Sequence, residues 1–130
     1  MRSDFRILIV DDDLNFVSSL RDVLEREGWE PAAASTGREA LAMCPSGTGF
    51  DLALVDIRLP DMEGLDVIRH MAAACPAMEF IIVTGHADLE DAMAAVQQPN
   101  IVGYQTKPLN IPELLSFVTQ VMERRQAQLR

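Results

Sequence analysis

The chain has 130 residues, the length of one domain, and 48% of them are hydrophobic, which indicates a folded core. Its formal net charge is −9, from 11 basic and 20 acidic residues. This charge argues against direct nucleic-acid binding, because an acidic surface repels the phosphate backbone. No segment reaches the roughly 18 apolar residues of a membrane span, and no cleavable apolar segment suggests export. We therefore expect a cytoplasmic domain without membrane contact.

Residues 52–56, Leu-Ala-Leu-Val-Asp, form the segment around which the other elements are arranged. Four consecutive apolar residues predict a strand buried on both faces, as in a parallel sheet. The strand stops at Asp56, and the Pro60-Asp61 turn with Gly64 does not allow it to continue. In open parallel sheets, ligands bind outside the carboxyl ends of the strands. Asp56 therefore lies where a functional residue is expected.

Strands and helices alternate along the rest of the chain. Strands are predicted at residues 6–10, 30–34, 52–56, 80–83 and 101–106. A helical pattern follows each strand. The first helix is predicted from Leu14 to a stop at Gly28, the second through Met43 after a cap at Ser35 or Thr36, and the third from Leu65 to before Pro76. The fourth is predicted from Asp88 to Gln97, and the fifth through Met122 after a cap at Asn110. Five such units predict a single doubly wound α/β domain: a flavodoxin-like, five-stranded parallel sheet in the order 2-1-3-4-5, with five helices.

Polar side chains follow the ends of four of these strands. The ends carry Asp11–Asp13, Asp56, Thr84 and Lys107. In the predicted order these four strands are neighbours, so the side chains should converge on one crevice. Crowded carboxylates repel each other unless a cation or a proton lies among them, and Mg²⁺ prefers carboxylate and carbonyl oxygens. With a hydroxyl and an ammonium opposite, the simplest site is one for Mg²⁺-assisted phosphoryl transfer onto an aspartate.

Each of these residues also has a purely structural explanation. Asp56 alone could be a turn or cap residue, and Asp13 is best interpreted as the N-cap of the first helix. Thr84 before Gly85 is a common turn pair, and Lys107 before a proline means little by itself. The joint occurrence of all four at separate strand ends favours the functional interpretation.

Over nearly its whole length the chain resembles the receiver domain of two-component response regulators, including the chemotaxis regulators. The motifs that carry the resemblance are Ile-Leu-Ile-Val-Asp-Asp at 7–12, Val-Asp-Ile-Arg-Leu-Pro-Asp-Met-Glu-Gly at 55–64, Ile-Val-Thr-Gly-His at 82–86 and Tyr-Gln-Thr-Lys-Pro at 104–108. The resemblance implies that Asp56 is the phosphoacceptor, supplied by a phosphohistidine on a sensor histidine kinase or phosphotransfer domain. It also implies that Asp12, Asp56 and the backbone carbonyl of Arg58 ligate Mg²⁺, with Asp11 acting through water.

The resemblance assigns roles to further residues. It implies that Lys107 pairs with a phosphoryl oxygen, that Thr84 swings its hydroxyl toward the phosphoryl group, and that the Tyr104 ring then turns inward. The alternative for Tyr104 is a half-buried aromatic at the sheet edge. Arg58 and His86, two residues past the phosphoacceptor and the threonine, are positions that tune the lifetime of the phosphoryl group. The alternative is that both are solvated polar residues. His70, on the third helix, is expected at the surface.

The sequence departs from the family pattern on the predicted output face, formed by the fourth helix, fifth strand and fifth helix. Residues 97–103 replace a short Gly-Ala turn, and Gln105 stands where an apolar residue is usual. This face should change its partner affinity on phosphorylation, and it allows a homodimer. We expect a receiver core over about 5–122 within residues 1–130. Residues 123–130 would end the last helix or lead to an output domain beyond residue 130.

Two other function classes fit less well. An aspartate-nucleophile phosphatase would normally carry a second carboxylate two residues past the nucleophile, where this chain has Arg58. A flavodoxin-like cofactor binder would offer hydroxyls and backbone N–H groups to the cofactor's phosphate in its first loop. Here the three aspartates at residues 11–13 would repel that phosphate. We predict a signalling module, not an enzyme, that catalyses only its own phosphorylation and dephosphorylation.

Overall fold

Five parallel strands form one sheet in the predicted order. The structure is a computed structural model that describes residues 5–44, 49–85 and 98–128. The strands are β1 (Ile7–Val10), β2 (Ala32–Ala34), β3 (Leu52–Val55), β4 (Glu79–Thr84) and β5 (Ile101–Thr106), and they lie in the order β2-β1-β3-β4-β5. The described helices are α1 (Leu14–Arg26), α2 (Gly37–Met43), α3 (Gly64–Ala74) and α5 (Ile111–Gln128). The predicted α/β class and sheet topology are confirmed, and the helix expected at 88–97 lies outside the described residues.

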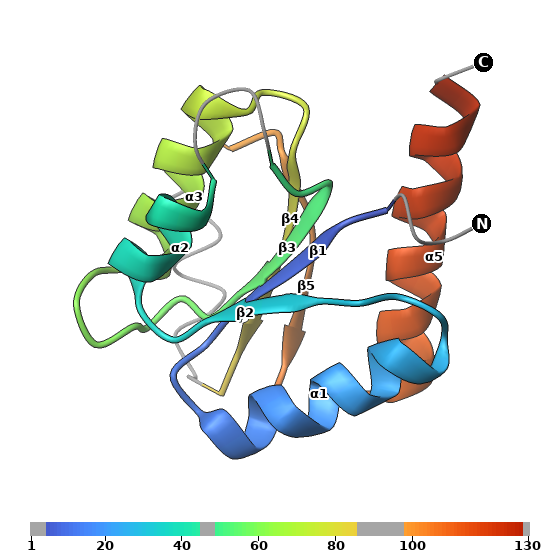
Figure 1. The fold of residues 1–130 in the computed structure, drawn as a ribbon, viewed down its shortest axis with the longest axis horizontal. Coiled ribbons are helices and arrows are strands. Elements are labelled where there is room, and N and C mark those ends of the chain that lie inside the picture. The colour runs from blue at the N-terminus through green and yellow to red at the C-terminus, as the bar shows by residue number, and fades with distance from the viewer. Residues whose placement is uncertain (1–4, 45–48, 86–97, 129–130) are drawn as a thin grey trace.

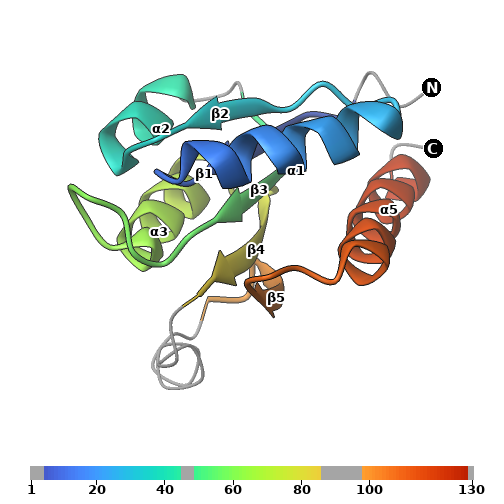
Figure 2. The same ribbon diagram turned by 90° about the horizontal axis from the view of Figure 1, so that it is seen from below.

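Of the helices that the structure describes, two lie on each face of the sheet (Figures 1 and 2). Helices α2 and α3 pack on one face against strand residues such as Leu8, Val55 and Ile82. Helices α1 and α5 pack on the other face against the alternate residues, such as Ile9 and Leu54. Every residue of β1 and β3 is buried because successive side chains in a strand point to opposite faces and both faces are covered.

Local signals in the sequence set several helix boundaries. Asp13 is the N-cap of α1, and its side chain accepts a hydrogen bond from the backbone N–H of Phe16, which otherwise has no partner within the helix. Past the end of α1, Gly28 has φ of 96°, a left-handed conformation that favours glycine. Thr36 caps α2 and Asn110 bonds the N–H of Glu113 at the start of α5. These predicted stops and caps are confirmed.

The two cysteines lie in the same apolar region of the fold and are not joined in a disulfide. Cys44 is buried in the apolar cluster beneath α2 and α3, and the partly buried Cys75 packs against this cluster. Burial, with a smaller contribution from the neighbouring Cys75, raises the pKa of the Cys44 thiol. Both therefore act as small apolar residues. Among the described helices, none is both long enough and apolar enough to cross a membrane.

Candidate functional site

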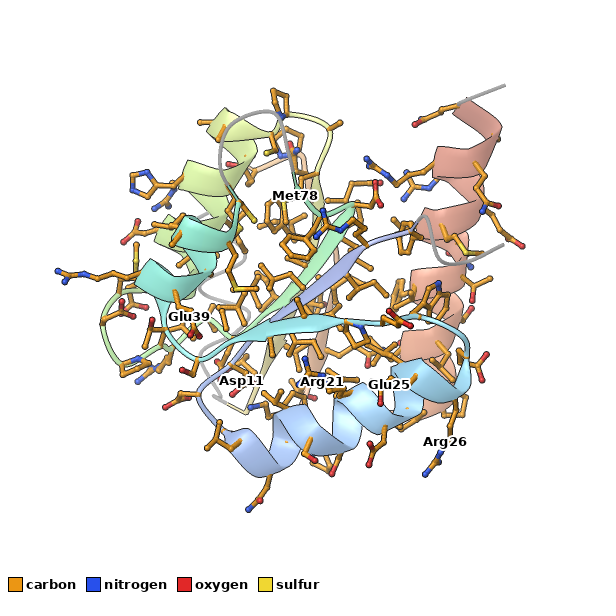
Figure 3. The ribbon with its side chains drawn as sticks, in the orientation of Figure 1. Asp11, Arg21, Glu25, Arg26, Glu39 and Met78 are labelled. Carbon is orange, nitrogen blue, oxygen red and sulfur yellow. The ribbon has the colours of Figure 1, made fainter. Side chains whose placement is uncertain are left out.

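Three aspartates meet at the carboxyl ends of β1 and β3. The two strands pair in register, with Val10 opposite Val55, so the residues that follow, Asp11 and Asp56, emerge side by side. Both are buried, with exposed fractions of 2% and 6%, and Asp12 beside them is exposed. One carboxylate oxygen from each of the three lies within 4.8 Å of the others. Figure 3 shows Asp11 where β1 leads into α1.

Lys107 supplies a positive charge to this cluster from the end of β5. Its Nζ lies 2.7 Å from Asp11 Oδ2 and 3.4 Å from Asp56 Oδ2. Its backbone N–H donates to the carbonyl of Thr84 at 2.9 Å, which ties the ends of β4 and β5 together. The ammonium also lies 4.1 Å from the centroid of the Phe16 ring. Lys107 thus links the acidic cluster to β5, which lies two strands away from β3 in the sheet.

The electrostatics of the cluster reflect an excess of negative charge. Burial raises the pKa of Asp11, and its ion pair with Lys107 only partly opposes this. For Lys107, burial alone lowers the pKa, but the contact and attraction of Asp11, aided by Asp56, outweigh it and the pKa is raised. One ammonium faces three carboxylates, so the cluster retains unneutralised charge. Such a site can bind a further cation.

The loop after β3 holds the Asp56 carboxylate in place. The backbone N–H of Arg58 donates to Asp56 Oδ1 at 3.0 Å. Farther along the loop, Asp61 accepts hydrogen bonds from the N–H groups of Gly37 and Arg38 at 2.8 and 2.9 Å. The loop is therefore fastened both to the acidic cluster and to the start of α2. The sequence analysis assigned no role to Asp61.

The remaining candidate residues occupy different environments. Thr84 is fully buried at the end of β4, next to the backbone of Lys107. Tyr104 on β5 is 50% exposed, which is expected both of a ring that turns inward only on phosphorylation and of an aromatic at the sheet edge. Arg58 and His70 are exposed, and for His70 this confirms the expected surface position. His86 lies outside the described residues.

Phe16, which the sequence analysis did not mention, contributes to this region, and Gln105, which it noted as an unusual polar residue, lies nearby on β5. Phe16 contacts the Lys107 ammonium from α1, and Gln105 on β5 is buried with both side-chain polar atoms unbonded. The periodicity of α1 gives no signal for Phe16, because the contact depends on where β5 ends. The polar residue in an otherwise apolar strand position is a signal for Gln105, but burial without a partner could not be foreseen.

The chain is similar in sequence to known proteins. The sequence profile of the response regulator receiver domain matches residues 7–119. Over 121 residues the chain is 36% identical to the alginate biosynthesis transcriptional regulatory protein AlgB of Pseudomonas aeruginosa, covering 93% of this chain and 26% of the relative. The chain therefore spans about a quarter of that regulator.

Solved structures also resemble this chain in fold and sequence. A CheY-like receiver domain protein from Methanospirillum hungatei JF-1 has a TM-score of 0.85 and 37% identity, over 95% of this chain and 98% of that one. The response regulator protein TrrA from Thermotoga maritima, in complex with Mg²⁺-BeF, has a TM-score of 0.77 and 28% identity, over 90% of this chain and 98% of that one. With the profile match covering most of the sequence, the chain belongs to the receiver domains of two-component response regulators.

Proposed function

We propose that Asp56 is the phosphoacceptor of this domain. The observation that carries the proposal is the position of its buried carboxylate, between two further aspartates and the ammonium of Lys107. In the transfer, the N–P bond of a donor phosphohistidine breaks as an Asp56 oxygen bonds to phosphorus, and the released imidazole takes up a proton. The donor would be a sensor histidine kinase or a phosphotransfer domain. Lys107 would pair with a phosphoryl oxygen.

The acidic cluster fits Mg²⁺. Three carboxylate oxygens within 4.8 Å of one another form a hard, negatively charged donor set, which this ion prefers. Asp12 and Asp56 would bind it directly, Asp11 through water, and the Arg58 carbonyl would complete the protein ligands. The ion would neutralise charge on the phosphoryl oxygens. The chain's own contribution is to bury Asp11 and Asp56, orient Asp56 through the Arg58 amide, and hold Lys107 nearby.

Phosphorylation would act as a switch through β4 and β5. It raises the charge on Asp56 to roughly −1.5 to −2 and adds acceptor oxygens. Thr84 would move its hydroxyl toward these oxygens, and the Tyr104 ring, 50% exposed here, would turn inward. The surface that includes β5 and α5 would then change its affinity for partners or for a second copy of the chain. An output domain linked to this one, in a cytoplasmic regulator, would receive the signal.

The test is phosphorylation in vitro with acetyl phosphate and Mg²⁺, read as intact mass. Wild type should gain one phosphoryl group, and Asp56→Asn none, because an amide cannot act as the acceptor. Asp66→Asn is the matched control, since its carboxylate lies exposed on α3 and pairs only locally with Arg69 at 2.7 Å; it should be modified like wild type. An equal mass gain in Asp56→Asn would disprove the proposal, and chelation of Mg²⁺ should suppress the wild-type gain.

Arg58 and His86 would tune how long the phosphoryl group persists. Arg58 is exposed at the mouth of the site, two residues past Asp56, and its side chain would limit water access to phosphorus. Arg58→Ala should therefore lose its phosphoryl group faster than wild type when acetyl phosphate is removed. An unchanged rate would exclude this role for Arg58 and leave the phosphoacceptor assignment intact.

A further inference from the structure

The Lys107 ammonium has an aromatic partner as well as acidic ones. Its Nζ lies 4.1 Å from the centroid of the Phe16 ring, within the range of a cation–π contact. The same atom lies 2.7 Å from Asp11 Oδ2 and 3.4 Å from Asp56 Oδ2. The Lys107 side chain is only 19% exposed, so little water screens these contacts. Three side chains therefore determine where the ammonium lies: Phe16 on α1, Asp11 after β1 and Asp56 after β3.

Phe16 is itself fixed relative to the acidic cluster. Its backbone N–H donates to the capping carboxylate of Asp13 at 3.1 Å, and the N–H of Asp13 donates to Asp11 Oδ1 at 2.9 Å. The Phe16 side chain packs against the apolar cluster beneath α1 and α5. The contacts form a closed loop: Asp11 binds Asp13, Asp13 binds Phe16, the ring of Phe16 contacts Lys107, and Lys107 pairs with Asp11. A shift of the ring would thus shift the ammonium.

An aromatic face suits this position for an electrostatic reason. A lysine side chain is long and flexible, so its ammonium needs partners to hold it in one place before charge develops on the substrate. A further carboxylate could do this but would repel the phosphoryl oxygens. The ring attracts the cation through its quadrupole and has no net charge. The ring therefore restrains Lys107 without adding negative charge at the site where the phosphoryl group would bind.

We propose that Phe16 is a positioning residue that holds the Lys107 ammonium against Asp11 and Asp56 for phosphoryl transfer. The functional part of this inference rests on Asp56 being the phosphoacceptor. The ring–ammonium contact itself does not, because it is present in the unmodified protein. Phe16 touches no reacting atom and acts only through Lys107.

The experiment uses the fact that Lys107 is the only lysine in the chain. Lysine-selective ¹³C labelling then gives a single ε-methylene signal, recorded without added metal, which reports the ring current of Phe16. Four proteins are compared: wild type, Phe16→Leu, Phe16→Tyr and Phe117→Leu. Phe117→Leu is the matched control, because Phe117 packs against the same apolar cluster but its ring faces Gly103 on β5. Phosphorylation by acetyl phosphate and Mg²⁺ is measured on the same samples, as intact mass over time.

We expect Phe16→Leu to lose the ring-current shift of Lys107 and to be phosphorylated about three- to tenfold more slowly, in line with the strength of cation–π contacts. Phe16→Tyr should keep both properties near wild type, and so should Phe117→Leu, even if each loses some stability. A wild-type signal and rate in Phe16→Leu would overturn the inference. An equal slowing in Phe117→Leu would also overturn it, because general packing would then explain the effect.

Failure of the proposed function would look different. If wild type gained no phosphoryl group, the rates would carry no information on Phe16 but the Lys107 signal would still report the contact. A Lys107 signal that is the same in wild type and Phe16→Leu would then refute the positioning role. A Lys107 signal that shifts in Phe16→Leu alone would support the positioning role. The assignment of Asp56 as the phosphoacceptor would then be the part that is wrong.

Discussion

Carboxylates and cations lie at both ends of the sheet, but the carboxylates are neutralised to different extents at the two ends. At the carboxyl ends of the strands, Asp11, Asp12 and Asp56 face the single ammonium of Lys107. At the other end, the carboxylates of Asp51 and Glu79 each have a guanidinium partner. Arg125 binds Asp51 at 3.0 Å, and Arg124 binds Glu79 at 3.1 Å. Figure 3 marks the two ends, with Asp11 at the first and Met78 at the second.

The difference shows how charge balance separates a scaffold from a site. The Arg124 and Arg125 pairs fasten the last turns of α5 to the start of β4 and to the residue before β3, and Arg125 also donates to the carbonyl of Ala77. Their charges cancel, so this end can do without a ligand. At the carboxyl end one ammonium faces three carboxylates, and burial of Asp11 makes this imbalance of charge more costly. The end that carries Asp51 and Glu79 stabilises the fold, and the carboxyl end is the one for which we propose cation and phosphoryl binding.

The largest effect should come from crowding the backbone at the carboxyl end. A Cβ added at Gly64 would overlap the carbonyl oxygen of Asp56 and lie 2.7 Å from the Cα of Ile57. Because backbone atoms cannot move aside as a side chain can, Gly64→Ala should lower the free energy of unfolding by about 3–4 kcal/mol. Chemical denaturation measures this. Gly85→Ala is the control, since its Cβ would meet only Lys107 Cβ, at 3.9 Å; a similar loss there would refute the explanation.

The same substitution at the two ends should have unequal effects. Asp51→Asn removes the charge that pairs with Arg125 and weakens the acceptor of the Arg6 N–H, so we expect a loss of about 1–3 kcal/mol in unfolding free energy. Asp11→Asn should leave Tm equal to or above that of wild type in the absence of Mg²⁺, because folding disfavours the charged form of Asp11. Equal losses from the two substitutions would contradict the proposed difference between the ends.

A smaller gain in stability should come from Gln105. Its side chain is buried on β5, and neither polar atom has a hydrogen-bond partner within the part of the chain that the structure describes. A buried amide without partners is destabilising, so Gln105→Leu should raise the free energy of unfolding by about 1–2 kcal/mol. Gln120→Leu, at an exposed position of α5, controls for added hydrophobicity and should change little. If Gln105→Leu lowered Tm, the amide would have to be satisfied in solution.

The smallest effect concerns Asp61, a carboxylate stabilised by backbone donors instead of cations. Hydrogen bonds from the N–H groups of Arg38 and Gly37 lower its pKa below the ordinary 3.8. A lowered pKa in the folded state contributes stability above the unfolded pKa, and this is lost as pH falls through the folded value. Asp61→Asn should therefore reduce Tm slightly at pH 7 and show a shallower fall in Tm on acidification to about pH 3. Parallel curves for the two proteins would contradict this.

Much of the fold could be predicted because its signals are local. The buried pattern of 52–55 identified a central parallel strand, and Asp13 and Gly28 marked the start and end of α1. The edge position of β2 followed from Pro31. The clustering of Asp11 with Asp56 was also predictable, because strands that end at the same edge bring their next residues together.

The contacts of the site were less predictable. The Phe16 contact with Lys107 joins α1 to the end of β5, and nothing in the sequence near either residue indicates it. Gln105 could be noted as unusual, but its burial with no partner among the described residues depends on how the chain packs around β5. In each case the side chain's environment is formed by an element distant in the sequence.

The sequence by itself determined the alternation of strands and helices and the polar residues at the strand ends, because periodicity, caps and turn residues act within a few positions. Tertiary structure alone decided which charges pair. Lys107 meets Asp56 across 51 positions and Arg125 meets Asp51 across 74. These choices depend on distances of a few ångströms and on exclusion of water, which arise only after the helices have packed on the sheet.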